Sequence, residues 1–241
     1  MAFTLALIGC GVIAYVVDDH PAMPDDVCIA RSDDGPRYSE LLADERITIA
    51  VVFGELAGGP DDYNARSASA LAGALRARGF RETAPSHFEA RAVTIDIAIH
   101  PNDKTVIGPA LTAAFATHEL VYYNGHSYEG DLDFAIPDDY RIAVLDTCWS
   151  TQLYSARVVG PSRDVIGNTD RSVTGSIDSL ITIVDGLRAH APAWQPLIER
   201  SNAHAVTRAL GRAPFSRYTA PEHYRLDSTR HGKSAGQRVA L

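Results

Sequence analysis

Short runs of consecutive apolar residues alternate along the chain with segments in which Ala and Leu recur at helical spacing. The apolar runs lie at 47–53, 92–99, 119–123, 141–146 and 164–166. Such runs are typical of strands buried on both faces of a parallel sheet. The helical spacing occurs at 63–78, 106–118, 176–189 and 194–210. The alternation predicts an α/β fold, a three-layer αβα sandwich built on a mostly parallel sheet.

Polar and turn-forming residues mark the expected helix boundaries. Asp61 and Asp62 precede the first helical segment as candidate N-caps, and Gly79 follows it as a candidate C-cap. Pro109 stands near the expected first turn of the second helical segment, where proline is tolerated. The start and stop signals therefore agree with the hydrophobic pattern.

The pattern divides the chain into three parts, 1–46, 47–210 and 211–241. The first part is expected to hold a buried strand within the apolar run 2–17 and a linker rich in Asp, Pro and Gly. This run is shorter than a membrane span and lacks the positive residues of a secretory signal. The last part is polar and interrupted by proline, so irregular structure is expected there.

The net charge and the cysteine spacing argue against some classes of function. The formal net charge of -8 argues against a nucleic-acid partner, because such proteins usually carry a basic stripe. Cys10, Cys28 and Cys148 lack metal-ligand spacing, so neither a structural zinc nor a cofactor is expected, while activation by calcium stays open. Cys10 and Cys28 are either bridged, as in an exported protein, or two buried thiols.

The N-terminus also bears on localisation. A cytoplasmic location is favoured and no firm membrane partner is expected. The run Leu7-Ile8-Gly9-Cys10 looks like a lipoprotein processing site, but few residues precede it. Export or lipid anchoring therefore remains the alternative if the true start lies upstream.

A histidine and a cysteine each follow the end of an expected buried strand. His126 comes after the run 119–123, and Cys148 comes after the run 141–146. In sheets of parallel strands, residues that handle ligands lie just beyond the carboxyl ends. An imidazole beside a thiol can generate the thiolate and protonate a leaving group. Gly125 would allow a tight turn that projects the histidine outward. The pattern predicts a His/Cys dyad at one edge of the sheet.

The residues around this pair resemble those of a known superfamily, the caspase, metacaspase and gingipain group of cysteine peptidases. The chain has Tyr-Asn-Gly-His-Ser at 123–127, where the group has Ser-Gly-His-Gly, and Asp-Thr-Cys-Trp-Ser at 146–150, where metacaspases have Asp-x-Cys-His-Ser. The segment 56–62 is similar to the metacaspase segment after the first strand, and 165–169 is similar to a gingipain strand. The resemblance covers roughly 47–185. Ser127 and Trp149 depart from the pattern, although neither replaces a catalytic atom.

The resemblance implies a caspase-like fold and a cysteine endopeptidase. Cys148 would be the nucleophile and His126 the general base and acid. The backbone N–H groups of Ser127 and Cys148 would form the oxyanion hole. Asp146 would line a pocket for Arg or Lys together with Asp62, with Asp61 as the shifted option. The implied partner is a polypeptide with a basic residue at the cut, because a carboxylate binds guanidinium by charge-assisted bonds.

Other interpretations fit single features of the sequence. A cysteine at a strand end is often an apolar filler, and the three aspartates can act as caps. The residues Gly125-His126-Ser127-Tyr128 resemble the nucleophile elbow of α/β-hydrolases, with Ser127 as nucleophile, although Glu129 stands at the final Gly position. A third alternative is a catalytically inactive caspase-like domain that binds or scaffolds.

Overall fold

The computed structural model describes residues 28–29, 35–54, 63–168, 177–202 and 215–219. Their strands form one nine-stranded sheet in the order β1-β9-β8-β7-β6-β2-β5-β4-β3. The central strands run parallel to one another: β5 (Val93–His100), β2 (Ile47–Gly54), β6 (Leu120–Asn124), β7 (Arg141–Asp146) and β8 (Arg163–Asn168). The flanking strands pair antiparallel: β4 (His87–Ala90), β3 (Arg81–Ala84), β9 (Phe215–Thr219) and β1 (Cys28–Ile29). The mostly parallel centre confirms the α/β prediction.

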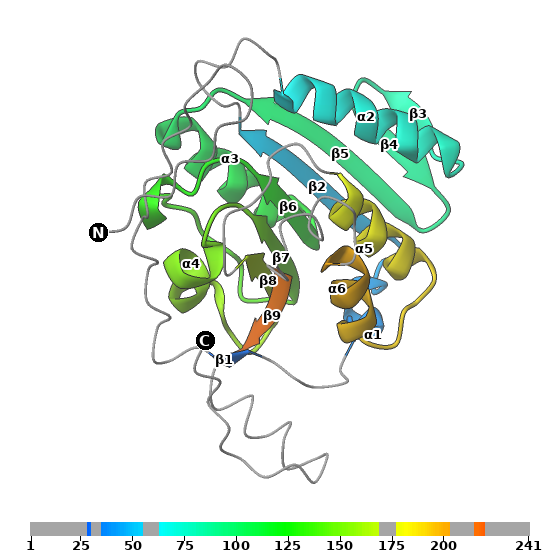
Figure 1. The fold of residues 1–241 in the computed structure, drawn as a ribbon. Coiled ribbons are helices and arrows are strands. Elements are labelled where there is room, and N and C mark those ends of the chain that lie inside the picture. The colour runs from blue at the N-terminus through cyan, green and yellow to red at the C-terminus, as the bar shows by residue number, and fades with distance from the viewer. Residues whose placement is uncertain (1–27, 30–34, 55–62, 169–176, 203–214, 220–241) are drawn as a thin grey trace, which may run out of the picture.

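Helices cover both faces of the sheet (Figure 1). One face packs against α3 (Lys104–Thr117) and α4 (Ser150–Val158). The other face carries α1 (Tyr38–Leu41), α2 (Tyr63–Ala77), α5 (Asp178–Arg188) and α6 (Gln195–Asn202). The described part of the chain therefore has the expected three layers.

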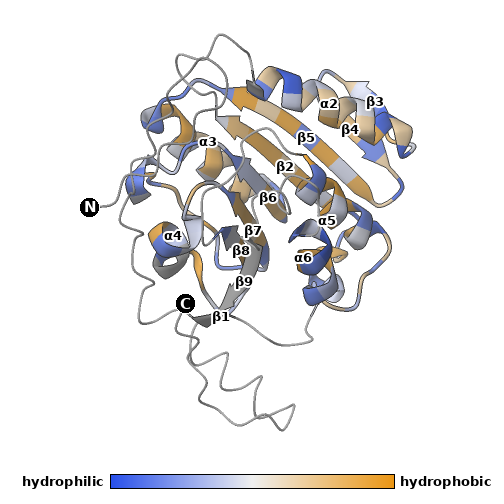
Figure 2. Ribbon diagram, viewed as in Figure 1, coloured by the Kyte–Doolittle hydropathy of each residue, from blue (hydrophilic) through white to orange (hydrophobic). Residues whose placement is uncertain are grey.

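The strands β2, β6 and β7 are mostly apolar because they contribute to two cores at once, whereas β5 contributes to one. In β2, Ile49, Val51 and Phe53 face the core beneath α2 and α5, whereas Ala50 and Val52 face the core beneath α3 and α4. Figure 2 shows β2 and β5 as hydrophobic bands between helices of mixed hydropathy. This double burial explains why the sequence shows continuous apolar runs rather than alternation.

Several boundaries differ from the expected ones. Helix α3 begins at Lys104 because Asp103 caps it, accepting a hydrogen bond from Thr105 N–H (2.8 Å). Pro109 therefore lies inside the helix and not in its first turn. Gly79 has φ +82°, which confirms a left-handed residue after α2. Only the part of 194–210 up to Asn202 is described, as α6.

The sequence pattern missed several elements, among them the β3–β4 hairpin, α4, β9 and β1. It predicted neither the β3–β4 hairpin nor α4, because both are short and their polar residues interrupt any long apolar periodicity. Strand β9 lies within the part 211–241, so irregular structure is wrong for Phe215–Thr219. Strand β1 likewise joins the sheet from the first part of the chain. The apolar run 2–17, Cys10 and the caps proposed at 61–62 lie outside the described residues.

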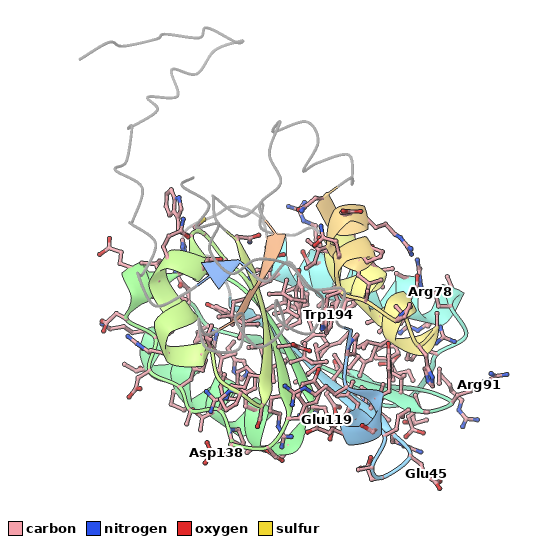
Figure 3. The ribbon with its side chains drawn as sticks, turned by 90° about the horizontal axis from the view of Figure 1, so that it is seen from below. Glu45, Arg78, Arg91, Glu119, Asp138 and Trp194 are labelled. Carbon is pink, nitrogen blue, oxygen red and sulfur yellow. The ribbon has the colours of Figure 1, made fainter. Side chains whose placement is uncertain are left out.

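A hydrogen-bonded group of buried side chains lies at the amino ends of β7 and β8. Asp164 Oδ2 accepts hydrogen bonds from Trp194 Nε1 (2.8 Å) and from the Tyr140 hydroxyl. Figure 3 shows Trp194 among the crowded side chains between sheet and helices, with Arg91 and Asp138 reaching outward at the periphery. No helix among the described residues has the length and apolar character needed to span a membrane.

Candidate active site

The ends of β6 and β7 bring the predicted histidine and cysteine segments together. These strands are adjacent and parallel, and Asn124 pairs with Asp146 in their register. His126 and Cys148 each lie two residues beyond that pair. Neighbouring strands are about 5 Å apart, so the two turns leave the sheet side by side. His126 is exposed, and Cys148 is a partly exposed thiol.

Cys148 occupies a tight turn between a strand and a helix. β7 ends at Asp146, and α4 begins at Ser150. Trp149, directly after the cysteine, has φ +48°. A left-handed conformation costs a non-glycine residue roughly 1–2 kcal/mol. The Ser150 hydroxyl offsets part of this cost by donating to Leu145 O (2.6 Å), which holds the start of the helix against the strand. Backbone strain therefore coincides with the proposed nucleophile.

The histidine turn depends on a close approach by an aromatic ring. The Tyr123 hydroxyl donates to His126 O (2.8 Å). A Cβ added at Gly125 would lie 2.6 Å from the Tyr123 hydroxyl oxygen and 2.9 Å from the adjacent ring carbon. Gly125 has no positive φ, so the turn requires glycine for space and not for backbone conformation, which corrects the sequence-based reason. The His126 ring also makes an edge contact with Tyr128, with ring centroids 5.9 Å apart.

Helix α4 is hydrogen-bonded to the loop that follows His126. The Tyr154 hydroxyl donates to Ser127 O. The Arg157 guanidinium donates to Gly130 O (2.7 Å) and Leu132 O (2.6 Å). The helix that starts after the cysteine thus fixes the loop that starts after the histidine. The Ser127 N–H forms no hydrogen bond with any described residue, as an oxyanion donor requires.

The buried Asp146 side chain accepts hydrogen bonds from three neutral side chains. Its carboxylate accepts from Asn124 Nδ2 (3.1 Å), from Asn168 Nδ2 (2.8 Å) and from the Tyr122 hydroxyl. Burial, and then the neighbouring Asp146 charge, raises the pKa of Tyr122 well above its ordinary value. The aspartate is only 4% exposed. Asp62 and Asp61, the predicted partners of Asp146 in a pocket, lie outside the described residues.

The sequence pattern indicated no role for Tyr122, Asn124 or Asn168. Asn124 and Asn168 are the last residues of β6 and β8, as Asp146 is of β7. Asparagine is disfavoured in strands, so a polar residue closing each of three apolar runs was the available signal. Tyr122 and Tyr154 gave no signal, because buried tyrosines are ordinary core residues until their hydroxyl partners are known.

Ser127 lies in a different setting from Cys148. It is followed by a single 3-10 turn, Tyr128–Gly130, and then by a loop that leads to β7. A nucleophile elbow places its serine between a strand and an α-helix. In this chain Cys148 has that setting, since it stands between β7 and α4.

Within the described ranges no group of three or more His, Cys, Asp or Glu side chains is arranged to hold a metal ion. A separate ionic cluster joins His87 Nδ1 to Asp96 Oδ1 (2.7 Å) and His118 Nε2 to Asp96 Oδ2 (3.0 Å). It lies on β4, β5 and the end of α3, away from the β6 and β7 ends. Comparison with protein-family models, curated proteins and solved structures finds no match to this chain.

Proposed function

We propose that this protein is a cysteine endopeptidase of the caspase-like superfamily, with Cys148 as nucleophile and His126 as general base and acid. The supporting observation is that two adjacent, parallel strands in register end two residues before these side chains. A mostly parallel sheet between two helical layers is the architecture that the resemblance implies. The strained strand–turn–helix at Cys148 adds support, because such strain gathers at functional sites.

The reaction assigns a task to each part of the site. His126 takes the proton of the Cys148 thiol, and the sulfur attacks the peptide carbonyl to form a tetrahedral oxyanion. The N–H groups of Ser127 and Cys148 would donate to this oxyanion. The imidazolium then protonates the leaving amine, and water attacks the thioester with His126 again as base. The start of α4, two residues after the sulfur, favours the thiolate over the thiol.

Asp146 carries the proposed preference for Arg or Lys before the cut. A buried carboxylate attracts a guanidinium or ammonium strongly, because the surroundings screen charge less than water does. The donors from Tyr122, Asn124 and Asn168 are neutral groups, so these three bonds orient the carboxylate and none of them cancels its charge. A substrate cation would share the carboxylate with these donors. Asp62 would add a second charge to the same pocket.

A panel of fluorogenic peptides with Arg, Lys, Asp or Asn before the cut tests the proposal on wild type, Cys148→Ala, His126→Ala and Asp146→Asn. We expect cleavage after Arg or Lys, loss of activity in the first two variants, and loss of the basic preference in the third. Activity that survives Cys148→Ala would remove the mechanism. A preference for acidic residues would remove the Asp146 pocket and leave the dyad intact.

Covalent probes separate the alternatives on the same samples. Iodoacetamide inactivation with labelling of Cys148 supports the peptidase. Fluorophosphonate labelling of Ser127 would support the serine hydrolase in its place. A folded sample that reacts with neither probe and cleaves no peptide would support the inactive binding domain.

A further inference from the structure

We infer that Asn168 is the positioning residue for the proposed nucleophile, and that Asn124 assists it from the opposite side. The inference rests on the proposed function and adds residues to its machinery. Neither asparagine need touch the substrate. Both would act by fixing the turn that carries Cys148 relative to His126.

Asn168 is hydrogen-bonded to residues on both sides of the cysteine. Before it, Asn168 Nδ2 donates to Asp146 Oδ1 (2.8 Å) and to Thr147 O (3.3 Å). After it, the Asn168 N–H donates to Ser150 Oγ (2.8 Å). The Ser150 hydroxyl in turn donates to Leu145 O (2.6 Å), so one residue of β8 closes both ends of the turn.

Asn124 holds the same strand end from β6. Its Nδ2 donates to Asp146 Oδ2 (3.1 Å) and to Asp146 O (3.2 Å). Both asparagines are fully buried, so water does not compete for these bonds. Because an ionised carboxylate only accepts, both amide groups must turn their nitrogen toward Asp146. The last residue of β7 is thereby fastened from both neighbouring strands.

The turn needs such fastening because its conformation is unfavourable. Trp149 adopts φ +48°, and without external bonds the chain would relax toward a right-handed conformation. Relaxation would move Cys148, which lies one residue earlier. Packing leaves little room for adjustment, since a Cβ added at Gly167 would lie 3.0 Å from both Ser150 Oγ and Thr151 Oγ1. A displacement of 1 Å between reacting groups can cost about 100-fold in rate.

Asn168→Ala tests the inference by kinetics and by thiol chemistry. We expect kcat to fall by about 100-fold with little change in KM, because positioning and not binding is lost. We also expect the midpoint of the pH profile for Cys148 alkylation, read by mass spectrometry of its peptide, to move up toward that of His126→Ala. A merely structural residue would lower the melting temperature without moving this midpoint.

Asn64→Ala is the matched control. Asn64 is equally buried, and its Nδ2 also donates to the carbonyl of a strand's last residue, Gly54 of β2. It should lower the melting temperature and leave the alkylation profile at its wild-type midpoint. The double variant Asp146→Asn with Asn168→Asp restores one donor–acceptor pair in the opposite direction. It should recover part of the alkylation profile that Asn168→Asp alone loses.

Hydrogen exchange separates failure of this inference from failure of the peptidase proposal. Loss of the bonds should speed amide exchange in 147–151 in Asn168→Ala, whether or not the protein cleaves peptides. If Asn168→Ala exchanges faster but the wild-type protein cleaves no peptide, the peptidase proposal is wrong. Asn168 would still be shown to hold the turn at Cys148. Unchanged exchange together with an unchanged alkylation profile would overturn the positioning role itself.

Discussion

The Tyr154 hydroxyl on α4 donates a hydrogen bond to the carbonyl of Ser127, the residue after His126. The helix that follows the proposed nucleophile is therefore bonded directly to the loop that carries the proposed base. Arg157, one turn later on the same helix, donates to Gly130 O and Leu132 O, farther along that loop. The two turns of the candidate site are thus parts of one hydrogen-bonded unit.

Tyr154→Phe should loosen the histidine loop. One partly buried hydrogen bond is lost, which costs about 1 kcal/mol of unfolding free energy. We expect faster amide exchange over 125–132 and a lower kcat against basic peptides. Tyr38→Phe is the control, because that hydroxyl also donates to a carbonyl, Ala191 O (3.3 Å), away from the strand ends. Equal exchange of the loop in both variants would contradict the link.

Two tyrosines allow a matched test of the Asp146 network. The Tyr122 hydroxyl donates to Asp146 at the carboxyl ends of the strands, and the Tyr140 hydroxyl donates to Asp164 at the amino ends. Each Tyr→Phe change should cost about 1–3 kcal/mol of stability, since a buried carboxylate loses a donor. The melting temperature should therefore fall by a similar amount in Tyr122→Phe and Tyr140→Phe. Only Tyr122→Phe should change the kcat/KM ratio between Arg and Asp peptides, and an equal effect of both would disprove a local role.

Gly125→Ala should damage the histidine turn. Its new methyl group would collide with the Tyr123 side chain, and overpacking of this kind costs about 1–3 kcal/mol. The Tyr123 bond to His126 O should weaken, so we expect lower activity and a lower melting temperature. Gly73→Ala on α2 is the control, because its Cβ meets nothing within 4 Å and should slightly raise stability. Normal activity in Gly125→Ala would show that the turn tolerates displacement.

The His87–Asp96 pair should give stability a pH dependence. Hydrogen bonding to Asp96 raises the pKa of His87. Burial alone would raise the pKa of Asp96, but the bonds from His118 and His87 outweigh it and lower that pKa. The histidine contribution is complete below pH about 6.5 and disappears as pH rises through the raised pKa. The aspartate contribution is complete above pH about 3.9 and disappears as pH falls through the lowered pKa.

The pair therefore stabilises the fold most between about pH 4 and 6.5. His87→Gln should lower the melting temperature most near pH 5.5 and least above pH 8. The loss of unfolding free energy should stay below about 1 kcal/mol, because both groups are partly exposed. His100→Gln removes an imidazole that forms no ion pair with any described residue, and serves as control. A pH-independent effect of His87→Gln would show that the ion pair contributes nothing.

Continuous apolar runs were enough to predict the central strands, because a strand that is buried on both faces is apolar at successive positions. The runs at 47–53 and 141–146 correspond to β2 and β7. Strand β9 had no such run, because it lies in the antiparallel part of the sheet, where pairing with β8 and β1 supplies the stability. Its existence follows from a neighbour more than forty residues away in the chain, which local periodicity cannot indicate.

For the candidate site, the sequence alone placed His126 and Cys148 just beyond two strand ends, since local hydrophobicity fixes where a strand stops. Only the tertiary structure decided that those strands are neighbours in register, because strand order depends on long-range packing. The tertiary structure likewise decided that Asn124 and Asn168 meet at Asp146. Hydrogen bonds between distant residues depend on the folded backbone, and nothing in the spacing of these three residues specifies them.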